Sequence, residues 1–408
     1  MKILITGNGF DIAHGLPTTY NEFINTIKLI KQSNVDNLPT DYLSYFQEND
    51  FFNNNSLIEK HFKFDKEKII ELKEKSNNLW LDFFIKQFNI YTWIDFEKQI
   101  ESIVQILDKI IIKLNTEVFN INDISIKSSN LISLLSQKSQ VIDTVFDFKL
   151  LEKHKFTNEN FVFNLRYCQT ASNQILHLKE DSFFKDLKIE LDNFAELFDM
   201  YLNIFVEPLS NILQESHTKE LKGITNHFTF NYTNTFKKLY KCNIDSFFLH
   251  GRISTTASTN NIIFGFNDVF ESIVETKNYI PFTKYYQKLS KETDYKYFDT
   301  IEIDGFTRVT IYFWGHSLNK SDKIYIDEAF ELIEKKTESS IKIFFHNKKS
   351  KDDIILNLMS MYDSAKIVDM CRKGKLIFLE TNTQNIKKEL DTFEERSRFM
   401  MEPSIHTY

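Results

Sequence analysis

The spacing of hydrophobic residues changes along the chain, and it predicts segments of different secondary structure. Residues 2–6 form a short β-branched and aliphatic run that stops at Gly7, which is typical of a buried strand followed by a tight turn. An apolar stripe at helical spacing follows, and Thr18 or Thr19 can cap its first turn. The stripe consists of Phe23, Ile24, Ile27 and Ile30. The N-terminal segment therefore predicts strand, turn and helix.

Between about residues 40 and 220 the pattern is helical, with few strand signals and almost no glycine. Helical stripes cover 69–88, 94–114 and 183–213. Strand-like runs resume after residue 220, at 224–230, 246–249, 262–266, 308–313, 341–345 and 375–379, with helical patterns at 321–336 and 351–362 between the later ones. Alternating strands and helices predict an α/β fold with a Rossmann-like, doubly wound parallel sheet and a large all-helical insertion.

We therefore predict three parts. Residues 1–38 supply the first strand, the glycine loop and a helix of the Rossmann-like domain, residues 39–220 form the helical insertion domain, and residues 221–408 complete the Rossmann-like domain. Ligands of such sheets bind at the carboxyl ends of the strands. The insertion carries aromatic stripes beyond what a nucleotide-binding sheet requires, so we expect it to mediate sensing or homo-oligomer assembly.

Composition narrows the class of protein. With 408 residues, 42% of them hydrophobic, the chain can bury a large core. A net charge of −7 disfavours an exposed nucleic-acid surface without excluding a local basic groove. The three scattered cysteines, Cys168, Cys242 and Cys371, provide neither a disulfide framework nor a four-thiolate zinc site. The N-terminus lacks a signal-peptide pattern and no apolar run reaches about 20 residues, so we predict a cytoplasmic protein with no membrane partner.

The glycine-rich stretch at residues 7–17 is the first candidate for chemistry. The chain has nine glycines and five prolines, yet Gly7, Gly9, Gly15 and Pro17 fall within these eleven positions. Their spacing, G-x-G-x5-G, differs from the G-x-G-x-x-G of ordinary dinucleotide folds. Glycines at the end of a strand leave backbone N–H groups and space for a phosphate. A plain strand–turn–helix joint is the alternative, and we favour phosphate or nucleotide binding.

Polar residues also follow the predicted strands in the second half of the chain, where a strand-end crevice would lie. They form the runs Thr229-Phe230-Asn231-Tyr232-Thr233-Asn234, His250-Gly251-Arg252, Gly265-Phe266-Asn267-Asp268 and Gly315-His316-Ser317-Leu318-Asn319-Lys320-Ser321-Asp322. Each has a structural alternative: Asn231 can cap a loop, and His250 can be a buried histidine at a turn. We expect Ser321 or Asp322 to cap the helix that follows.

Trp93, Asp95 and Glu97 lie near the predicted start of a helix in the insertion. Asp95 is a good N-cap, and Glu97 is placed where the helix dipole favours negative charge. We favour this interpretation over an acidic catalytic pair. Since no histidine or third acid stands at ligand spacing, we predict no metal.

The run Gly7-Asn8-Gly9-Phe10-Asp11-Ile12-Ala13-His14-Gly15-Leu16-Pro17-Thr18-Thr19-Tyr20 resembles the signature of the AbiH family of bacterial phage abortive-infection proteins. A Trp followed by Asp and Glu, as in residues 93–97, also recurs in that family. The same run is similar to the sirtuin fingerprint G-A-G-x-S-x-x-x-G-I-P-x-F-R, with Asp11 in place of the Ser and Tyr20 in place of the Arg. Sirtuin deacetylases also carry a four-cysteine zinc ribbon, which three cysteines cannot supply.

Three later motifs extend this resemblance. Sirtuin-like NAD hydrolases of phage defence carry an Asn in a T-x-N-Y-D type run, then an H-G pair, then a G-x-S run with a following Asp. Residues 230–234, the pair His250-Gly251 and residues 315–322 resemble these motifs in the same order. The resemblance covers residues 1–20 and 220–330.

The resemblance implies an anti-phage protein that binds NAD+ as substrate rather than cofactor and cleaves its nicotinamide–ribose bond when infection triggers it. Asn231 would orient the ribose or the attacking water, and His250 would be the general base on water or a ribose hydroxyl. Asp11 would face the ribose. The other implied ligand-binding residues are Gly7, Asn8, Gly9, Phe10, Gly15, Pro17, Thr18, Tyr20, Tyr232, Gly251, Gly315, His316, Ser317 and Asp322.

Two other functions compete with NAD+ hydrolysis. One is a nucleic-acid-directed toxin, an RNase or a nucleotidyl transferase, and the acidic net charge disfavours it. The other is a non-catalytic nucleotide sensor or scaffold, which would not need the base His250. The replacements at residues 11 and 20 weigh against hydrolysis, because they leave the NAD-contacting set incomplete. A phage-derived trigger is the further partner we expect.

Overall fold

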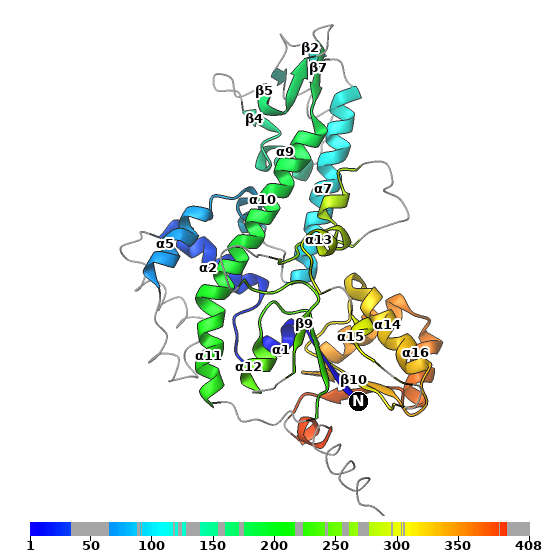
Figure 1. Cartoon of the computed structure of the whole chain (residues 1–408). Helices are drawn as coiled ribbons and strands as arrows, with labels where there is room; N and C mark the ends of the chain where they lie inside the picture. The colour runs from blue at the N-terminus through cyan, green and yellow to red at the C-terminus, as the bar shows by residue number, and fades with distance from the viewer. Residues whose placement is uncertain are drawn as a thin grey trace, which may run out of the picture.

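A six-stranded parallel sheet forms the base of the molecule (Figure 1). The computed structural model describes residues 1–33, 65–87, 90, 92–116, 119–120, 125–127, 139–153, 160–170, 175–216, 223–240, 244–254, 261–267, 277–294, 297–302, 304, 307–382 and 384–389. The strands, in chain order, are β1 (Lys2–Thr6), β8 (Asn226–Thr229), β9 (Ser246–Phe248), β10 (Thr310–Trp314), β11 (Ser340–Phe345) and β12 (Leu376–Glu380). They lie in the order β12-β11-β10-β1-β8-β9. The predicted Rossmann-like sheet is confirmed, and its strand order reverses between β1 and β10.

Helices cover both faces of this sheet. Ile3 and Ile5 of β1 belong to one core with α14, α15 and α16, whereas Leu4 belongs to another with Phe10 of α1 and Phe236 of α12. The helices near the sheet are α1 (Asn8–Ala13), α12 (Thr235–Leu239), α13 (Lys284–Ser290), α14 (Lys323–Glu334), α15 (Lys348–Met361) and α16 (Ser364–Arg372), with 3-10 turns η5 (Ile280–Phe282), η6 (Phe298–Thr300) and η7 (Lys320–Asp322). Because both faces are covered, every residue of β1 and all but the first residue of β10 are buried.

The predicted strand at residues 262–266 is wrong. This segment is extended and buried, but it makes only an isolated bridge between Phe266 and Thr283. Side chains of α13 and its C-terminal end replace a neighbouring strand: Gln287 donates to the carbonyl of Phe264, and Lys291 donates to that of Ile262. Apolar content alone does not distinguish such a segment from a strand.

The insertion is mainly helical, and its long helices α7 and α10 rise away from the sheet (Figure 1). Its helices are α5 (Lys66–Lys75), α6 (Leu79–Lys86), α7 (Trp93–Thr116), α9 (Ser139–Asp147), α10 (Glu180–Tyr201) and α11 (Glu207–Ser216), with a 3-10 turn η3 (Leu165–Tyr167) and a π-helical segment η4 (Leu202–Val206). The prediction of an all-helical insertion is wrong in one respect, because two small antiparallel sheets lie at its far end. Their strands are β2 (Phe119–Asn120), β3 (Ser125–Lys127), β4 (Leu151–Lys153), β5 (Asn160–Phe163), β6 (Cys168–Thr170) and β7 (Ile175–Leu178). Strands of two to four residues are too short to show a period in the sequence.

The three predicted long helices of the insertion differ in outcome. The helix at 94–114 is confirmed as α7, and the one at 183–213 corresponds to α10 and α11, which continue through η4. The helix at 69–88 is instead two helices, α5 and α6. Asn78 causes the break, since its side chain accepts from the backbone N–H of Leu81 and starts α6 as an N-cap.

The aromatic stripes of the insertion are buried in its own core. Phe96 of α7 stacks on Phe194 of α10 with ring centroids 5.6 Å apart, and Phe84 of α6 lies 4.6 Å from Phe96. Helix α2 (Tyr20–Gln32), capped by Thr19 as predicted, also packs its apolar face into this core. The aromatics named here are therefore core residues. The predicted domain boundaries, after residues 38 and 220, fall outside the described residues.

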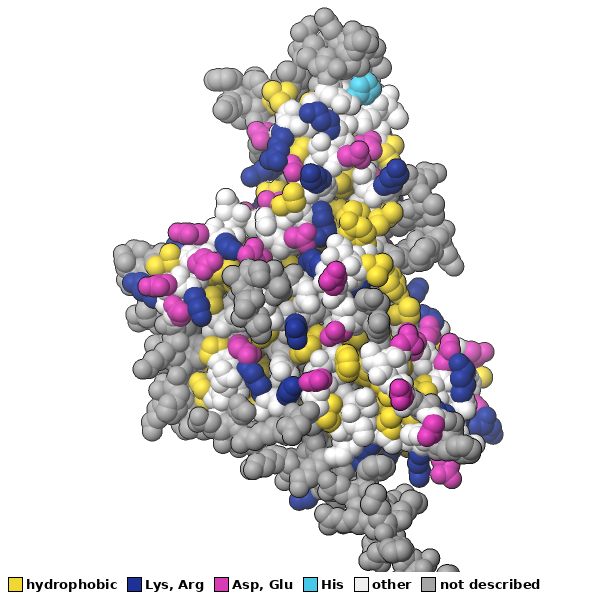
Figure 2. All heavy atoms as spheres, in the orientation of Figure 1, with side chains coloured by type: hydrophobic (Ala, Val, Ile, Leu, Met, Phe, Trp, Pro, Cys, Tyr) yellow, Lys and Arg dark blue, Asp and Glu magenta, His cyan; other side chains and the backbone are white. Residues whose placement is uncertain are grey.

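Charged side chains of both signs are interspersed on the face shown in Figure 2. No helix in the described ranges is long and apolar enough to cross a membrane. Cys168 and Cys371 are free thiols, and Cys242 lies outside the described residues. The described surface on this face thus offers no large patch of one sign that would attract a polyanion.

Candidate functional site

Three glycines bring two loops into backbone contact where the strand order reverses. The N–H of Gly7 donates to the carbonyl of Trp314 (3.0 Å), and the N–H of Gly9 donates to that of Gly315 (2.8 Å). A Cβ atom added to Gly315, which has a φ of +70°, would lie 2.0 Å from the backbone nitrogen of Phe10. The glycines therefore join the loops that follow β1 and β10, a contact that we call the glycine crossing. The N–H groups of Gly7 and Gly9 are both engaged in it.

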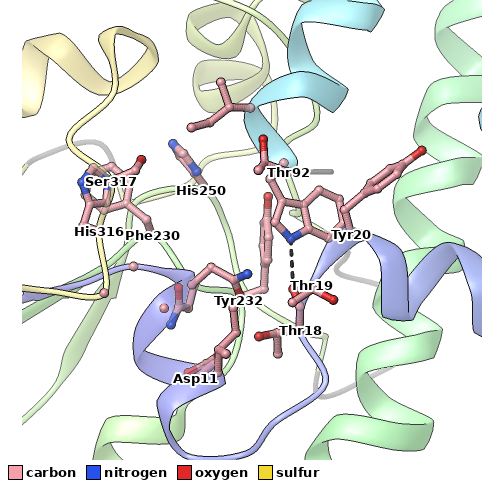
Figure 3. A pocket seen from close by; sticks show the side chains of 18 of the residues that line it. Asp11, Thr18, Thr19, Tyr20, Thr92, Phe230, Tyr232, His250, His316 and Ser317 are labelled. Carbon is pink, nitrogen blue, oxygen red and sulfur yellow. Dashed lines mark hydrogen bonds between the residues drawn. The ribbon is translucent and has the colours of Figure 1, made fainter. Parts of the chain in front are cut away.

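A cavity of about 290 Å3 lies beside this crossing, at the carboxyl ends of β1, β8, β9 and β10 (Figure 3). Most of the predicted site residues line it, namely Gly7, Asn8, Gly9, Asp11, Thr18, Tyr20, Asn231, Tyr232, His250, Gly315, His316, Ser317 and Asp322. In Figure 3, two groups of labelled side chains face each other across it: Phe230, His250, His316 and Ser317 on one side, and Thr18, Thr19, Tyr20 and Thr92 on the other. The sequence thus identified residues that the fold brings together from four segments.

The other predicted residues, Phe10, Gly15, Pro17 and Gly251, do not line the cavity. Phe10 packs edge-on against Trp314 beneath it. The carbonyl of Pro17 accepts from the hydroxyl of Tyr201 (2.7 Å). At Gly251, with a φ of +85°, an added Cβ would lie 2.0 Å from the carbonyl oxygen of Asn261. These positions shape the surrounding loops.

Tyr20, at the position of the fingerprint Arg, reaches the cavity edge but packs its ring among Phe84, Trp93 and Phe96. Its hydroxyl is buried and has no hydrogen-bond partner among the described residues. Burial also raises the pKa of this hydroxyl. The side chain therefore contributes apolar area to the wall rather than a charge.

Asp11, on α1, is buried in the cavity floor. One carboxylate oxygen, Oδ2, accepts from the hydroxyl of Thr233, whereas Oδ1 has no hydrogen-bond partner within the described ranges. Burial raises the pKa of Asp11 to about 6, although the side chains of Thr233, Thr235 and Asn231 act in the opposite direction. The Oδ1 atom of Asn231 is buried without a described partner as well. Two unpaired oxygens at one site are typical of a position prepared for a ligand.

Asp322 is contacted by two histidines and a lysine. Its Oδ1 lies 3.3 Å from His250 Nε2 and 3.5 Å from Lys284 Nζ, and its Oδ2 lies 3.3 Å from His316 Nε2. The contact with His250 has the distance of an ion pair but not the alignment of a hydrogen bond. Burial alone would raise the pKa of Asp322, but Lys284, His250 and His316 hold it well below its usual value. Asp322 is therefore ionised.

The predicted capping role of Ser321 or Asp322 is wrong. Asp322 occupies the N-cap position of α14, but its side chain makes no cap hydrogen bond. Asn319 caps the preceding turn η7 instead, by accepting from the N–H of Ser321 (3.2 Å). The carboxylate of Asp322 is thereby left for the histidines.

The two histidines that contact Asp322 differ in their surroundings. Nδ1 of His316 accepts from the N–H of Leu318 (3.0 Å), so its proton is on Nε2, which faces Asp322. Burial and, to a smaller extent, the nearby Lys284 together lower the pKa of His250 to about 3, against the attraction of Asp322.

Helix α7 brings the insertion to the cavity. The indole N–H of Trp93 donates to the carbonyl of Thr18 (2.9 Å; dashed line in Figure 3), and Glu97 lines the cavity. The predicted N-cap at Asp95 is wrong: Thr92 caps the helix, and Asp95 accepts in return from the N–H of Thr92 (3.2 Å). Of these two carboxylates, only Glu97 lines the cavity.

The sequence analysis missed Lys284, whose Nζ lies 2.8 Å from Glu97 Oε1. Lysine and arginine total 50 in this chain, and nothing in the local pattern separates Lys284 from the exposed ones. Within the described residues, no group of three or more His, Cys, Asp and Glu side chains is arranged to hold a metal ion.

Residues 3–347 match the family model described as Bacteriophage abortive infection AbiH. The chain belongs to the AbiH family. Searches of curated proteins and of solved structures found no match. The family match extends over the glycine crossing, the insertion and all the cavity residues named above, so the cavity of this AbiH protein lies wholly within the region that defines the family. Membership associates the chain with phage abortive infection.

Proposed function

We propose that this AbiH protein hydrolyses NAD+ in the cavity, at the nicotinamide–ribose bond, and that this reaction serves abortive infection in the cytoplasm. The observation that carries the proposal is a cavity at the switch point of a doubly wound sheet, in which buried oxygens of Asp11 and Asn231 have no hydrogen-bond partner among the described residues. Nucleotides bind at such switch points. The similarity of the glycine run and of the later motifs to sirtuin-like NAD hydrolases supports the same substrate.

The chemistry of the reaction suits the residues present. The C1′–N bond breaks with its electron pair moving to the nicotinamide nitrogen, water oxygen bonds to C1′, and one proton is released. Positive charge develops on the ribosyl group, and Asp11 would stabilise it. Asn231 would orient the ribose, and neutral His250 would form a hydrogen bond with a ribose hydroxyl.

Phosphate binding takes a different form from the one expected of the glycine run. Since the N–H groups of Gly7 and Gly9 are engaged in the loop crossing, we assign the phosphates to the side chains of Asn8 and Ser317. Both line the cavity next to the crossing.

The test follows nicotinamide release from NAD+ by purified protein, with and without lysate from phage-infected cells. We expect release by the wild type and its loss in His250→Ala and Asn231→Ala. His346→Ala is the matched control, because His346 is exposed and does not line the cavity. Absence of release in every condition, with binding of another nucleotide, would instead favour a sensor. Degradation of added RNA would favour a nucleic-acid-directed toxin.

We also propose that a phage-derived trigger acts through the insertion and that the insertion mediates homo-oligomer formation. Its exposed apolar side chains include Ile112, Leu165 and Ile189. Leu165→Glu combined with Ile189→Glu is expected to lower the mass measured by sedimentation. An unchanged mass would show that these side chains are not the contact.

A further inference from the structure

Glu97 reaches the cavity from a different part of the chain than the strand-end residues. It lies on the second turn of α7, a helix of the insertion, and its neighbours are Lys284 of α13 and, through Lys284, Asp322. Lys284 Nζ is 2.8 Å from Glu97 Oε1 and 3.5 Å from Asp322 Oδ1. Two carboxylates therefore share one buried ammonium group.

The two carboxylates differ in their access to solvent. The side chain of Glu97 is 16% exposed, against 10% for Asp322 and 4% for Lys284. Glu97 also lines a second, larger hollow of about 670 Å3, which shares Ile94, Glu97 and Ser321 with the first. Glu97 thus stands at the junction between the cavity and a groove that leads to the surface.

We propose that Glu97 is the general base of the site: it accepts a proton from the attacking water and releases it to solvent through the second groove. The inference rests on the proposed hydrolysis. As the water oxygen bonds to C1′ and the C1′–N bond breaks, nicotinamide leaves as a neutral molecule, so the one proton to be transferred is that of the water. A base with an exit to solvent is therefore sufficient, and no general acid is required.

The electrostatics of the cluster agree with this role. Burial raises the pKa of Glu97 to about 7, Lys284 and Lys288 of α13 lower it, and Asp322 raises it. Asp322 is held ionised, and His250 has a pKa of about 3, which is too low for an efficient base near neutral pH. The remaining charged groups around Glu97 line the second groove: Lys98, Glu101, Lys320, Lys323 and Asp327.

The test compares Glu97→Gln with Asp95→Asn, a matched control on the same helix that lies outside both hollows. Glutamine keeps an oxygen that accepts from Lys284 but cannot accept the proton of water. For the wild type, nicotinamide release should rise with pH and level off above about 7. In Glu97→Gln, the rate of nicotinamide release should fall by about 100-fold or more and should not rise with pH. Glu97→Asp should retain the pH-dependent rise at a lower rate.

A merely structural ion pair gives a different result. In that case Glu97→Gln would lower thermal stability and leave the pH profile of the remaining activity unchanged, which would overturn the proposal. The ligand-free protein gives a second measurement, since the infrared carboxylate difference between wild type and Glu97→Gln reports the titration of Glu97 directly. Titration of Glu97 near pH 4 would also overturn the proposal.

Phage protection separates this inference from the choice of substrate. If the wild type releases no nicotinamide, yet Glu97→Gln abolishes protection and Asp95→Asn retains it, the role of Glu97 stands and NAD+ is the wrong substrate. If Glu97→Gln protects as well as the wild type, Glu97 is not the base.

Discussion

Lys284 Nζ lies 2.8 Å from Oε1 of Glu97, and this contact joins the helical insertion to the part of the chain that follows β9. The same ammonium group lies 3.5 Å from Asp322 Oδ1, just before α14. One buried lysine thus holds together a carboxylate from the insertion and one from the Rossmann-like sheet. The position of the insertion and the charge state of the cavity are therefore coupled at a single side chain.

Lys284→Met should lower the free energy of unfolding by about 3 kcal/mol, because it leaves Glu97 and Asp322 close together without their shared counter-ion. The measurement is urea unfolding near neutral pH. Lys335→Met is the control: Lys335 pairs with Glu331 on an exposed helix surface, and its loss should cost less than about 0.5 kcal/mol. Equal effects of the two substitutions would contradict the role of Lys284 as the buried counter-ion that Glu97 and Asp322 share.

Gly315→Ala should destabilise the protein by about 3 kcal/mol, since its Cβ would lie 2.0 Å from the nitrogen of Phe10 in a backbone with a φ of +70°. Gly374→Ala isolates the conformational part of this cost. Gly374 has a φ of +68° with nothing within 4 Å of an added Cβ, so about 1 kcal/mol is expected. Similar losses at both positions would mean that the loops can separate without penalty.

Asp11→Asn should stabilise the ligand-free protein by about 2 kcal/mol at pH 7. The pKa of Asp11 is about 6 in the folded protein, against the ordinary aspartate value of 3.8 that applies to the unfolded chain. The folded state therefore binds the proton more tightly. The contribution of the protonated Asp11 carboxyl to the stability of the folded protein is present below about pH 4 and is lost as the pH rises through 6. The gain from Asp11→Asn should therefore appear between pH 4 and 6 and remain above it. A gain that does not change with pH would contradict this assignment.

Tyr20→Phe should raise the free energy of unfolding by about 1 kcal/mol, because it removes a buried hydroxyl that lacks a partner in the described structure. The ring would keep its contacts with Trp93 and Phe96. Phage protection should be unchanged. Loss of protection at normal stability would show that the hydroxyl binds the ligand after all.

Much of the fold could be predicted from the pattern of strands and helices. The positions of β1, β9, β10 and β12 follow from mainly apolar runs, because buried parallel strands have that composition, whereas polar residues interrupt the runs that contain β8 and β11. Residues 262–266 have the same composition but are hydrogen-bonded by the side chains of Gln287 and Lys291. Pairing with a side chain rather than with a strand leaves no local signal.

The site was predicted from residues that follow strands, and this approach succeeded where the sheet itself places them. His250, Asn231 and Asp322 each come shortly after a strand, so their convergence follows from parallel pairing. Lys284 and Glu97 lie on helices, and their approach depends on how α7 and α13 pack. Helix packing is decided by long-range contacts, which a single sequence does not reveal.

The pairing of β1 also sets the order in which a newly made chain can fold. Residues 2–6 leave the ribosome well before their partners, which begin at residues 226 and 310. The insertion, with its own aromatic core, is synthesised in between. The central strand β1 therefore has no strand to pair with until β8 has been translated, because its parallel partners are far along the chain. The cavity cannot form before β10 emerges, and a ribosome that stops early releases a chain without a site.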